Sequence, residues 1–443
     1  MPNAPSTAAT TEVLTIGDEL LRGELVDSNS AWLAGRLGEL GLPASRFSTA
    51  SDELGDIVEQ LRSAAGRCSA LMVSGGLGPT EDDRTAQAVA QAAGVELELH
   101  EAQLEAIKAR FAAVSLPFTD NNAKQAWLPH GALVLDNDIG TAPGFSVKIG
   151  GCRVFCMPGV PRELMRMFDR HVASVLESEL GGQRPELRRV KVFGLAEAQV
   201  DHMLRGLGDG IDGRGCTVTI HYRATFPEIH ASVVVRGGEG GAAGEVADAY
   251  AEAMAERLAG NVFARDAATS FADALVATLR EHGATVAFAE SCTGGRTGDL
   301  ITNAAGSSDV FLGSLVTYSN SAKEQLLGVP SEVLQRDGAV SQRCVEAMAR
   351  GARERFGSDY AVAISGVAGP GGGSAEKPVG TVHFALAGPD GLMRHVHRVF
   401  RYGERDRVKQ VSAYVAAWLV YRALTAPGAD DVIGKRWAPR GTR

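Results

Sequence analysis

The chain has 443 residues, a length that predicts about three domains of ordinary size rather than one. Hydrophobic residues make up 45% of it and charged residues 22%, so large cores can form and general disorder is excluded. The formal net charge of −9 argues against direct binding of nucleic acid, which needs concentrated Lys and Arg. The 53 glycines exceed the usual share of about 7% and suit an α/β protein with ligand-binding loops.

No run approaches the roughly 20 apolar residues of a membrane span, and the first ten residues lack the basic start and apolar core of a secretion signal. We therefore expect a cytoplasmic protein without a membrane partner. The cysteines show no metal-ligand spacing, so we expect them to be reduced and mostly buried. They are Cys68, Cys152, Cys156, Cys216, Cys292 and Cys344.

The N-terminal segment, residues 11–172, alternates apolar runs with amphipathic stretches, which predicts a parallel sheet covered by helices on both faces. EVLTIG is the first predicted strand, and CSALMVS is a buried strand that leads into the loop GGLGPTEDD. Open α/β sheets bind ligands in the crevice at the carboxyl ends of their strands. The loop therefore predicts a ligand site at this edge of the sheet.

This loop and the turn GDEL after the first strand carry the chemistry of the segment. Backbone amides of the glycine-rich part can bind a phosphate, and the nearby carboxylates can hold a divalent cation that bridges to it. Alternatively, Thr80 and Asp82 cap the following helix and GDEL is a plain turn, which is compatible with ligand binding. The candidate phosphate ligands are Gly75, Gly76, Gly78 and Thr80, and the candidate metal ligands are Asp18, Glu19, Asp82 and Asp83.

Two further domains are predicted after the first. Residues 185–265 show a βαββαβ order, which predicts a small α+β domain, and the pattern assigns it no chemistry. Its Glu228 and His230 fit the alternation of a half-exposed strand. Residues 268–425 predict a second layered α/β/α domain, and residues 426–443 mix Gly, Pro and charges without periodicity, which predicts a disordered tail.

Three polar loops follow strands of this last domain. Ser291 begins SCTGG, between a predicted strand and helix, where free amides and the helix dipole favour developing negative charge. Alone, Ser291 would be read as a helix cap before a tight turn. The other loops are residues 317–323 and 365–370, which also follow apolar runs. Three such loops at the ends of three strands predict one site.

Ser291 is the preferred nucleophile of that site, and Lys323 is the candidate base because burial or a neighbouring cation can lower the pKa of a Lys. The alternative for Lys323 is a solvated helix residue. Cys292 is the rival nucleophile, since thiols at helix N-termini tend to ionise, but its side chain should point away from the face that Ser291 uses. His383 fits a strand position better than a base.

At these residues the chain resembles the competence/damage-inducible protein CinA family, over nearly its whole length from Glu12 to about Leu424. The motifs, in order, are GDELLRGELVDSNSAWLA, GGLGPTEDD, GTAPGF, MPGVPRE, AESCTGG, VTYSNSAK, GAVS and VAGPGGG followed by KPVGTV. The resemblance implies a molybdopterin-binding-like N-terminal domain with metal-dependent ADP-ribose pyrophosphatase activity. It implies a C-terminal amidase domain that hydrolyses nicotinamide mononucleotide to nicotinate mononucleotide and ammonia, in pyridine nucleotide recycling.

Carried over by motif, the resemblance makes Ser291 the nucleophile and Lys323 the general base, and it matches Gly75, Gly76, Gly78 and Asp83 to the N-terminal family loop. The amidase needs no cofactor, whereas the N-terminal domain needs a divalent cation such as Mg²⁺. The implied substrate contacts are Thr293, Gly294, Gly295, Tyr318, Ser365 and Gly366. The chain departs from the family at Ser365, where Thr is usual, and at Arg296, where a small or apolar residue is frequent.

A non-enzymatic alternative remains open for the N-terminal domain. It would bind a nucleotide or pterin without turnover, and the chain would act through protein contacts in competence or the response to DNA damage. The acidic balance favours protein contacts over DNA contacts. Apolar helices in all three segments lead us to expect a homodimer.

Overall fold

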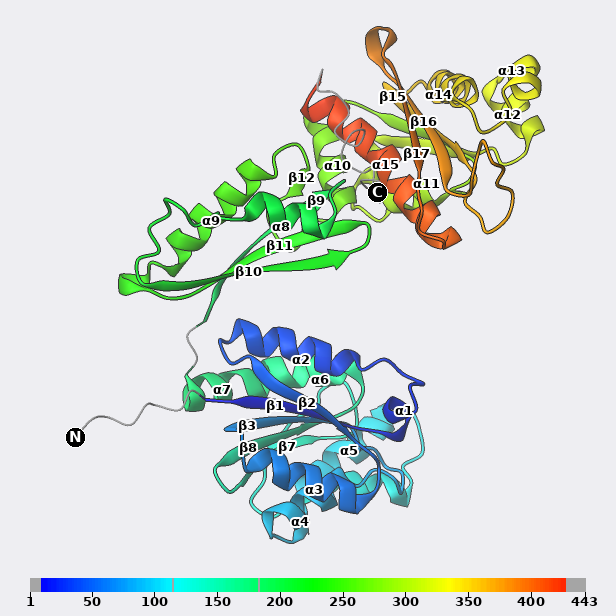
Figure 1. Ribbon diagram of the computed structural model, residues 1–443. Helices are drawn as coiled ribbons and strands as arrows, with labels where there is room; N and C mark the ends of the chain where they lie inside the picture. Colours follow the sequence, from blue (N-terminus) through cyan, green and yellow to red (C-terminus); the bar gives the residue numbers. More distant parts are fainter. Residues whose placement is uncertain (1–8, 114, 182–183, 428–443) are drawn as a thin grey trace. The chain divides into compact units, whose positions relative to one another are not determined.

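The computed structural model describes residues 9–113, 115–181 and 184–427, and these form two compact units that divide between Pro185 and Glu186 (Figure 1). The predicted disordered tail, residues 426–443, lies outside the described residues except for its first two positions. Among the described helices, none has the length and apolar character needed to cross a membrane. All six cysteines are free, as expected.

The first unit is built on a six-stranded sheet in the order β2-β1-β3-β8-β7-β6. The first four strands are parallel, and β7 and β8 form an antiparallel hairpin. A separate two-stranded ribbon joins β4 and β5. The strands are β1 (Thr11–Ile16), β2 (Ala44–Ala50), β3 (Ala70–Ser74), β4 (Leu97–Leu99), β5 (Trp127–Pro129), β6 (Leu133–Leu135), β7 (Gly144–Ile149) and β8 (Cys152–Met157).

Helices cover both faces of this sheet, which confirms the predicted three-layer architecture (Figure 1). Leu33 and Leu164 lie in the core on one face, with α2, α6 and α7, while Ile57 and Val89 lie in the core on the other, with α3 and α4. The helices are α1 (Asp18–Leu21), α2 (Ser28–Glu39), α3 (Leu54–Ala65), α4 (Thr85–Ala93), α5 (Glu101–Ala113), the 3-10 helix η1 (Asp120–Ala126), α6 (Pro161–Met167), the π-helix η2 (Phe168–Val172) and α7 (Ala173–Leu180).

The second unit contains two sheets. The antiparallel sheet β10-β11-β9-β12 packs against α8 and α9, which confirms the predicted βαββαβ order. The other sheet has the order β14-β13-β15-β16-β17, with its first three strands parallel. The strands are β9 (Glu186–Phe193), β10 (Cys216–Thr225), β11 (Glu228–Gly237), β12 (Val262–Ala264), β13 (Val286–Glu290), β14 (Phe311–Val316), β15 (Tyr360–Gly366), β16 (Thr381–Ala387) and β17 (Met393–Val399).

Helices also cover both faces of the five-stranded sheet, so this part is α/β/α as predicted. The first core contains residues of α10, α11 and α15, and the second contains residues of α12, α13 and α14. The helices of the unit are α8 (Glu197–Leu204), α9 (Ala243–Arg257), α10 (Phe271–Glu281), α11 (Arg296–Thr302), α12 (Asn320–Leu327), α13 (Ser331–Arg336), α14 (Gln342–Phe356) and α15 (Arg405–Thr425).

The two sheets of the second unit share a core. Phe193 of β9 stacks on Phe271 of α10 at 6.1 Å and contacts Trp418 of α15 at 5.4 Å between ring centroids. Glu228 and His230 on β11 are buried, not half-exposed as the alternation predicted. Their side chains are hydrogen-bonded to each other at 2.8 Å, and the Tyr414 hydroxyl of α15 donates to Glu228. These two residues therefore belong to the contact between the sheet and α15.

Candidate functional site

The carboxyl ends of three parallel strands place the polar loops of the second unit together. Strand β13 pairs with β14 on one side and with β15 on the other, and Ser291 directly follows β13. The chain after β14 turns into α12, which begins at Asn320 and carries Lys323. As a result, Lys323 Nζ lies 3.1 Å from Ser291 Oγ, although the two residues are far apart in sequence.

Lys323 is enclosed by protein. Its side chain is only 1% exposed, and Nζ also donates to the backbone carbonyls of Thr317 at 2.8 Å and Tyr318 at 3.3 Å. Burial lowers the pKa of Lys323 from its ordinary value, because the charged form loses its hydration. The third contact of Nζ is its hydrogen bond to Ser291 Oγ, and loss of one proton from the ammonium would leave a lone pair that can accept the Ser291 proton. This arrangement suits proton transfer from Ser291 to Lys323.

The amides at the start of α11 are not free, contrary to the sequence-based expectation. The fully buried Glu290 carboxylate accepts hydrogen bonds from the amides of Gly295, Thr297 and Gly298, each at 3.0 Å. The Ser314 hydroxyl donates to the same carboxylate at 2.7 Å. Glu290 therefore fixes the turn that carries Ser291, and it occupies three of the amides that this turn could have offered to a ligand.

The rival catalytic groups are placed unfavourably. Cys292 packs into the hydrophobic core, and burial raises the pKa of its thiol to about 12, so it does not ionise near neutral pH. His383 lies within β16 with its ring 2.9 Å from His395 and stacked on His397. Burial lowers the pKa of His383 to about 4. Neither group matches the contact of Lys323 with Ser291.

A cavity of about 250 Å³ opens at Ser291, and we call it the serine cavity. Of the substrate contacts that the resemblance implies, Tyr318 and Gly366 line it. Thr293, Gly294, Gly295 and Ser365 do not; the Ser365 hydroxyl instead donates to the Ala339 carbonyl at 2.7 Å. The lining consists of Ser291, Cys292, Tyr318, Gly366, Val367, Ala368, Gly369, Gly371, Gly372 and Arg405.

Arg405, the first residue of α15, is a cation of the serine cavity that the sequence analysis missed. Its guanidinium donates to the Gly369 carbonyl at 2.6 Å and approaches the Tyr318 hydroxyl at 3.4 Å. The guanidinium is suited to a phosphate or carboxylate of a ligand. Arg296 is engaged elsewhere, in an ion pair with Asp406 at 2.7 Å.

In the first unit, the predicted glycine-rich loop follows β3 and passes close to the end of β1. A side chain on Gly75, whose φ is +108°, would lie 2.4 Å from the Ile16 carbonyl oxygen, so only glycine fits there. Asp83 accepts hydrogen bonds from the Thr80 amide and hydroxyl, at 2.9 and 2.5 Å. Neither Thr80 nor Asp82 caps the following helix α4, because Arg84 occupies the cap position.

A second cavity, of about 430 Å³, lies against this loop, and we call it the acid cavity. Gly75, Gly76 and Gly78 line it, whereas Asp18 does not: its carboxylate meets Arg22 at 3.3 Å. Among the described residues that line it, none is Lys, Arg or His. Its carboxylates are Glu19, Asp52, Asp82, Asp83 and Glu163.

Asp52 and Glu163 were not predicted from the sequence. Burial, with the charges of Asp18, Glu19 and Asp82 adding to it, raises the pKa of Asp52. Within the described chain, no three His, Cys, Asp or Glu side chains gather closely enough to hold a metal ion by themselves. The acid cavity still fits a hard cation such as Mg²⁺, which is commonly held by one or two carboxylates together with the phosphates of its substrate.

Comparisons with known proteins agree with this two-part organisation. Residues 268–424 match the model described as "CinA C-terminal domain", and residues 12–178 match the one described as "Probable molybdopterin binding domain". A CinA-like protein of Anaeromyxobacter dehalogenans is 43% identical over 417 residues, which cover 93% of this chain and 99% of the relative. One of Geotalea daltonii is 43% identical over 421 residues, 94% of this chain and 99% of the relative.

Among solved structures, the competence/damage inducible protein CihA from Agrobacterium tumefaciens is 40% identical. The match covers 34% of this chain and 91% of that one, with a TM-score of 0.33. A mixed α/β protein that joins a molybdopterin-binding fold to a CinA C-terminal domain is the class defined here. The chain belongs to the CinA-like protein family.

Proposed function

We propose that the second unit hydrolyses nicotinamide mononucleotide to nicotinate mononucleotide and ammonia at the serine cavity. The observation that carries this proposal is the 3.1 Å contact between Ser291 Oγ and the buried Nζ of Lys323. A serine hydrogen-bonded to a lysine whose pKa is lowered by burial is suited to act as an activated nucleophile for acyl transfer. The family resemblance supplies the substrate.

In this reaction the Ser291 hydroxyl attacks the carboxamide carbon of the substrate and passes its proton to Lys323. The tetrahedral intermediate collapses when Lys323 returns that proton to the departing ammonia. Water then hydrolyses the acyl-enzyme and releases the carboxylate product. The amides of Cys292 and Thr293 lie outside the set bound by Glu290, which makes them the candidates for stabilising the oxyanion.

The serine cavity also fits the substrate's charge. Nicotinamide mononucleotide carries one phosphate, and Arg405 offers a guanidinium in the cavity wall, where it is hydrogen-bonded to the carbonyl of Gly369 in the glycine-rich segment. Tyr318, whose hydroxyl lies beside Arg405 and which is 64% exposed, is free to contact the ring or the ribose. In this assignment the phosphate orients the carboxamide toward Ser291.

We further propose that the first unit splits ADP-ribose into AMP and ribose 5-phosphate with the help of a divalent cation. The supporting observation is the acid cavity itself: five carboxylates line it beside the glycine-rich loop, and its described lining residues include no Lys, Arg or His. A pyrophosphate would be repelled there unless cations accompany it. Glu19, Asp82 and Asp83 are the carboxylates proposed from sequence that line this cavity.

One parallel assay tests both activities in the intact protein. Purified protein receives nicotinamide mononucleotide or ADP-ribose, with EDTA or with Mg²⁺, and ammonia and AMP are measured. We expect ammonia release to be the same in both conditions, and AMP formation to stop in EDTA and return with Mg²⁺. Absence of ammonia would contradict the amidase, and EDTA-resistant AMP formation would contradict the metal-dependent pyrophosphatase.

A further inference from the structure

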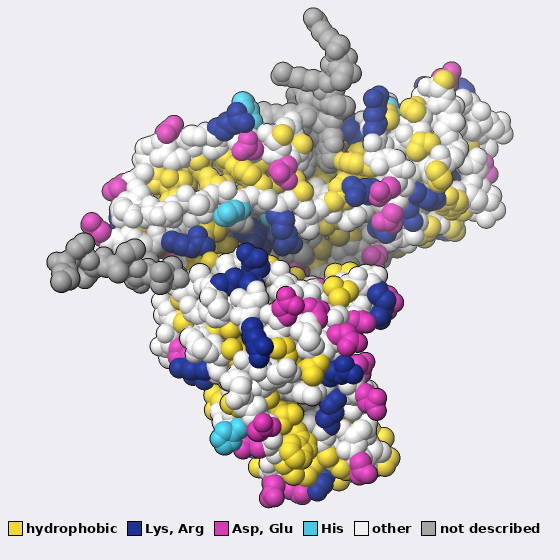
Figure 2. All heavy atoms as spheres, turned by 60° about the horizontal axis from the view of Figure 1, so that its bottom comes forward, with side chains coloured by type: hydrophobic (Ala, Val, Ile, Leu, Met, Phe, Trp, Pro, Cys, Tyr) yellow, Lys and Arg dark blue, Asp and Glu magenta, His cyan; other side chains and the backbone are white. Residues whose placement is uncertain are grey.

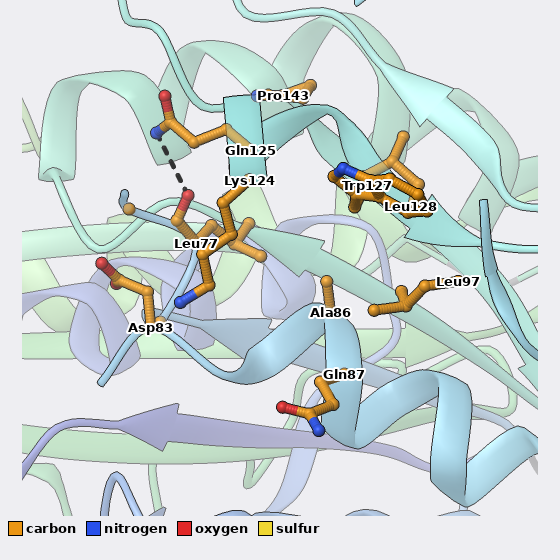
Figure 3. Close-up of a pocket in the computed structure, with 12 residues that line it drawn as sticks. Leu77, Asp83, Ala86, Gln87, Leu97, Lys124, Gln125, Trp127, Leu128 and Pro143 are labelled. Atoms are coloured by element: carbon orange, nitrogen blue, oxygen red, sulfur yellow. Dashed lines mark hydrogen bonds between the residues drawn. The ribbon is translucent and has the colours of Figure 1, made fainter. Parts of the chain in front are cut away.

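A second, smaller pocket of the first unit is lined by the glycine-rich loop that also lines the acid cavity, and we call it the tryptophan slot (Figure 3). Its apolar wall consists of Ala86 of α4, Leu97 of β4, Trp127 and Leu128 of β5, and Pro143. Trp127 remains 43% exposed and lines the slot, so part of its side chain is available to a ligand.

The slot and the acid cavity share one wall. Gly76, Leu77, Gly78, Asp83 and Gln125 line both of them. Gln125 is buried, and its amide nitrogen donates to the Leu77 carbonyl at 3.2 Å, which ties the loop to η1. A ligand whose phosphates lie at the loop is therefore next to the slot as well.

The two ends of the slot differ in chemistry. Figure 3 shows Asp83 and Lys124 at one end and Trp127 with Leu97 at the other. The polar end faces the loop, and the apolar end offers a flat aromatic surface. This division matches a ligand with a charged part and a planar ring.

Size limits which part of a ligand the slot holds. Its volume is about 90 Å³. Cavities that enclose a whole small molecule span roughly 300–1,000 Å³, a range that includes the acid cavity but not the slot. The slot therefore receives a single flat group, while the acid cavity takes the larger, charged remainder.

We propose that the tryptophan slot binds the adenine ring of an adenine nucleotide, stacked on Trp127, while its phosphates lie at the glycine-rich loop. The choice of adenine rests on the proposed pyrophosphatase function. Nucleobases stack on exposed aromatic side chains through their π-faces. A pterin carries more hydrogen-bonding groups around its ring than adenine, so more of them would lie against the apolar wall of the slot.

The test measures binding of AMP and of ribose 5-phosphate to the full-length protein with Mg²⁺, by equilibrium dialysis. Trp127→Ala is expected to raise the Kd of AMP by about tenfold, the loss that removal of one base-stacking contact causes, and to leave the Kd of ribose 5-phosphate unchanged. Trp127→Phe, which retains a ring and guards against misfolding, should keep most of the AMP affinity.

A fluorescence measurement identifies the contact itself. AMP should quench the tryptophan emission of the wild type, and Trp127→Phe should lose this quenching while dialysis still detects AMP. The matched control is Trp32→Phe, because Trp32 packs edge-on against Phe168, 5.5 Å away in the core under α2. That variant should keep the quenching.

Three results would overturn the proposal: no AMP binding, equal AMP affinity in the wild type and Trp127→Ala, or quenching by a pterin but not by AMP. These results differ from a failure of the proposed function. AMP binding that depends on Trp127, in a protein that does not cleave ADP-ribose, would remove the pyrophosphatase and keep the slot. Cleavage of ADP-ribose with a KM that Trp127→Ala leaves unchanged would keep the pyrophosphatase and remove the slot as the adenine site.

Discussion

Replacing Lys323 with Met is expected to slow ammonia release from nicotinamide mononucleotide by about 10²–10⁴-fold, the usual contribution of a general acid and base. Methionine keeps the length and burial of the side chain but cannot accept the Ser291 proton. The rate is measured as kcat/KM with the protein at matched concentrations. Lys148→Met, at an exposed position of β7 in the other unit, is the control and should leave the rate unchanged.

The pH dependence of the wild type gives a second readout for Lys323. Only the neutral amine accepts a proton, so the rate should rise with pH as Lys323 deprotonates. Because burial lowers the pKa of Lys323 from 10.5, this rise should be centred below pH 10.5. The rise should be absent from the residual rate of Lys323→Met. A Met variant with the full rate and the same profile would exclude Lys323 as the base.

Replacing Glu290 with Ala is expected to lower the free energy of unfolding by about 3 kcal/mol or more. The carboxylate accepts four hydrogen bonds in a fully buried position, and each buried donor left without an acceptor costs about 1–3 kcal/mol. Urea denaturation measures the change. Hydrogen exchange should also accelerate at the amides of Gly295, Thr297 and Gly298.

Two further variants sharpen the Glu290 test. Glu290→Gln retains one oxygen, which can still accept from Gly298 and Ser314, so its loss of stability should be intermediate. Glu354→Ala, at an exposed position of α14, should change the unfolding free energy by no more than about 0.5 kcal/mol. A Glu290→Ala protein as stable as the wild type would show that water or a rearranged turn replaces the carboxylate.

The central strands of both α/β sheets were predicted correctly because strands buried on both faces are continuous apolar runs. Ala70–Ser74 and Val286–Glu290 are fully buried, and the loops that follow them were recognised as ligand sites for that reason. Strand β2, Ala44–Ala50, was not predicted. It lies at the sheet edge with mostly half-exposed or exposed side chains, so it has no apolar run.

The serine cavity was only partly predictable. Sequence order places Ser291 and Lys323 after neighbouring strands, but their contact depends on how α12 packs, which no spacing reveals. Glu290 had a usable signal: an acid that ends an apolar strand directly before a glycine turn is buried and must be hydrogen-bonded. Arg405 had no such signal in the sequence, because it is the first residue of the last helix and lies far along the chain from the other residues of the cavity.

The acid cavity was also only partly predictable from the sequence. Glu19, Asp82 and Asp83 line the cavity as predicted from sequence. Asp18, which precedes Glu19 in the turn GDEL, does not line it and forms an ion pair with Arg22 instead. Its other two carboxylates come from separate elements: Asp52 follows the unpredicted strand β2, and Glu163 lies on α6. Only tertiary folding joins these elements, so local pattern could not identify the full set.

The nucleophile is the central claim, and it is tested most directly by ammonia release from nicotinamide mononucleotide in EDTA by the wild type, Ser291→Ala and Cys292→Ala. We expect the wild type and Cys292→Ala to release ammonia and Ser291→Ala to release none above background, with all three equally folded by circular dichroism. Release by Ser291→Ala, or its loss in Cys292→Ala alone, would contradict the assignment of Ser291 as the nucleophile.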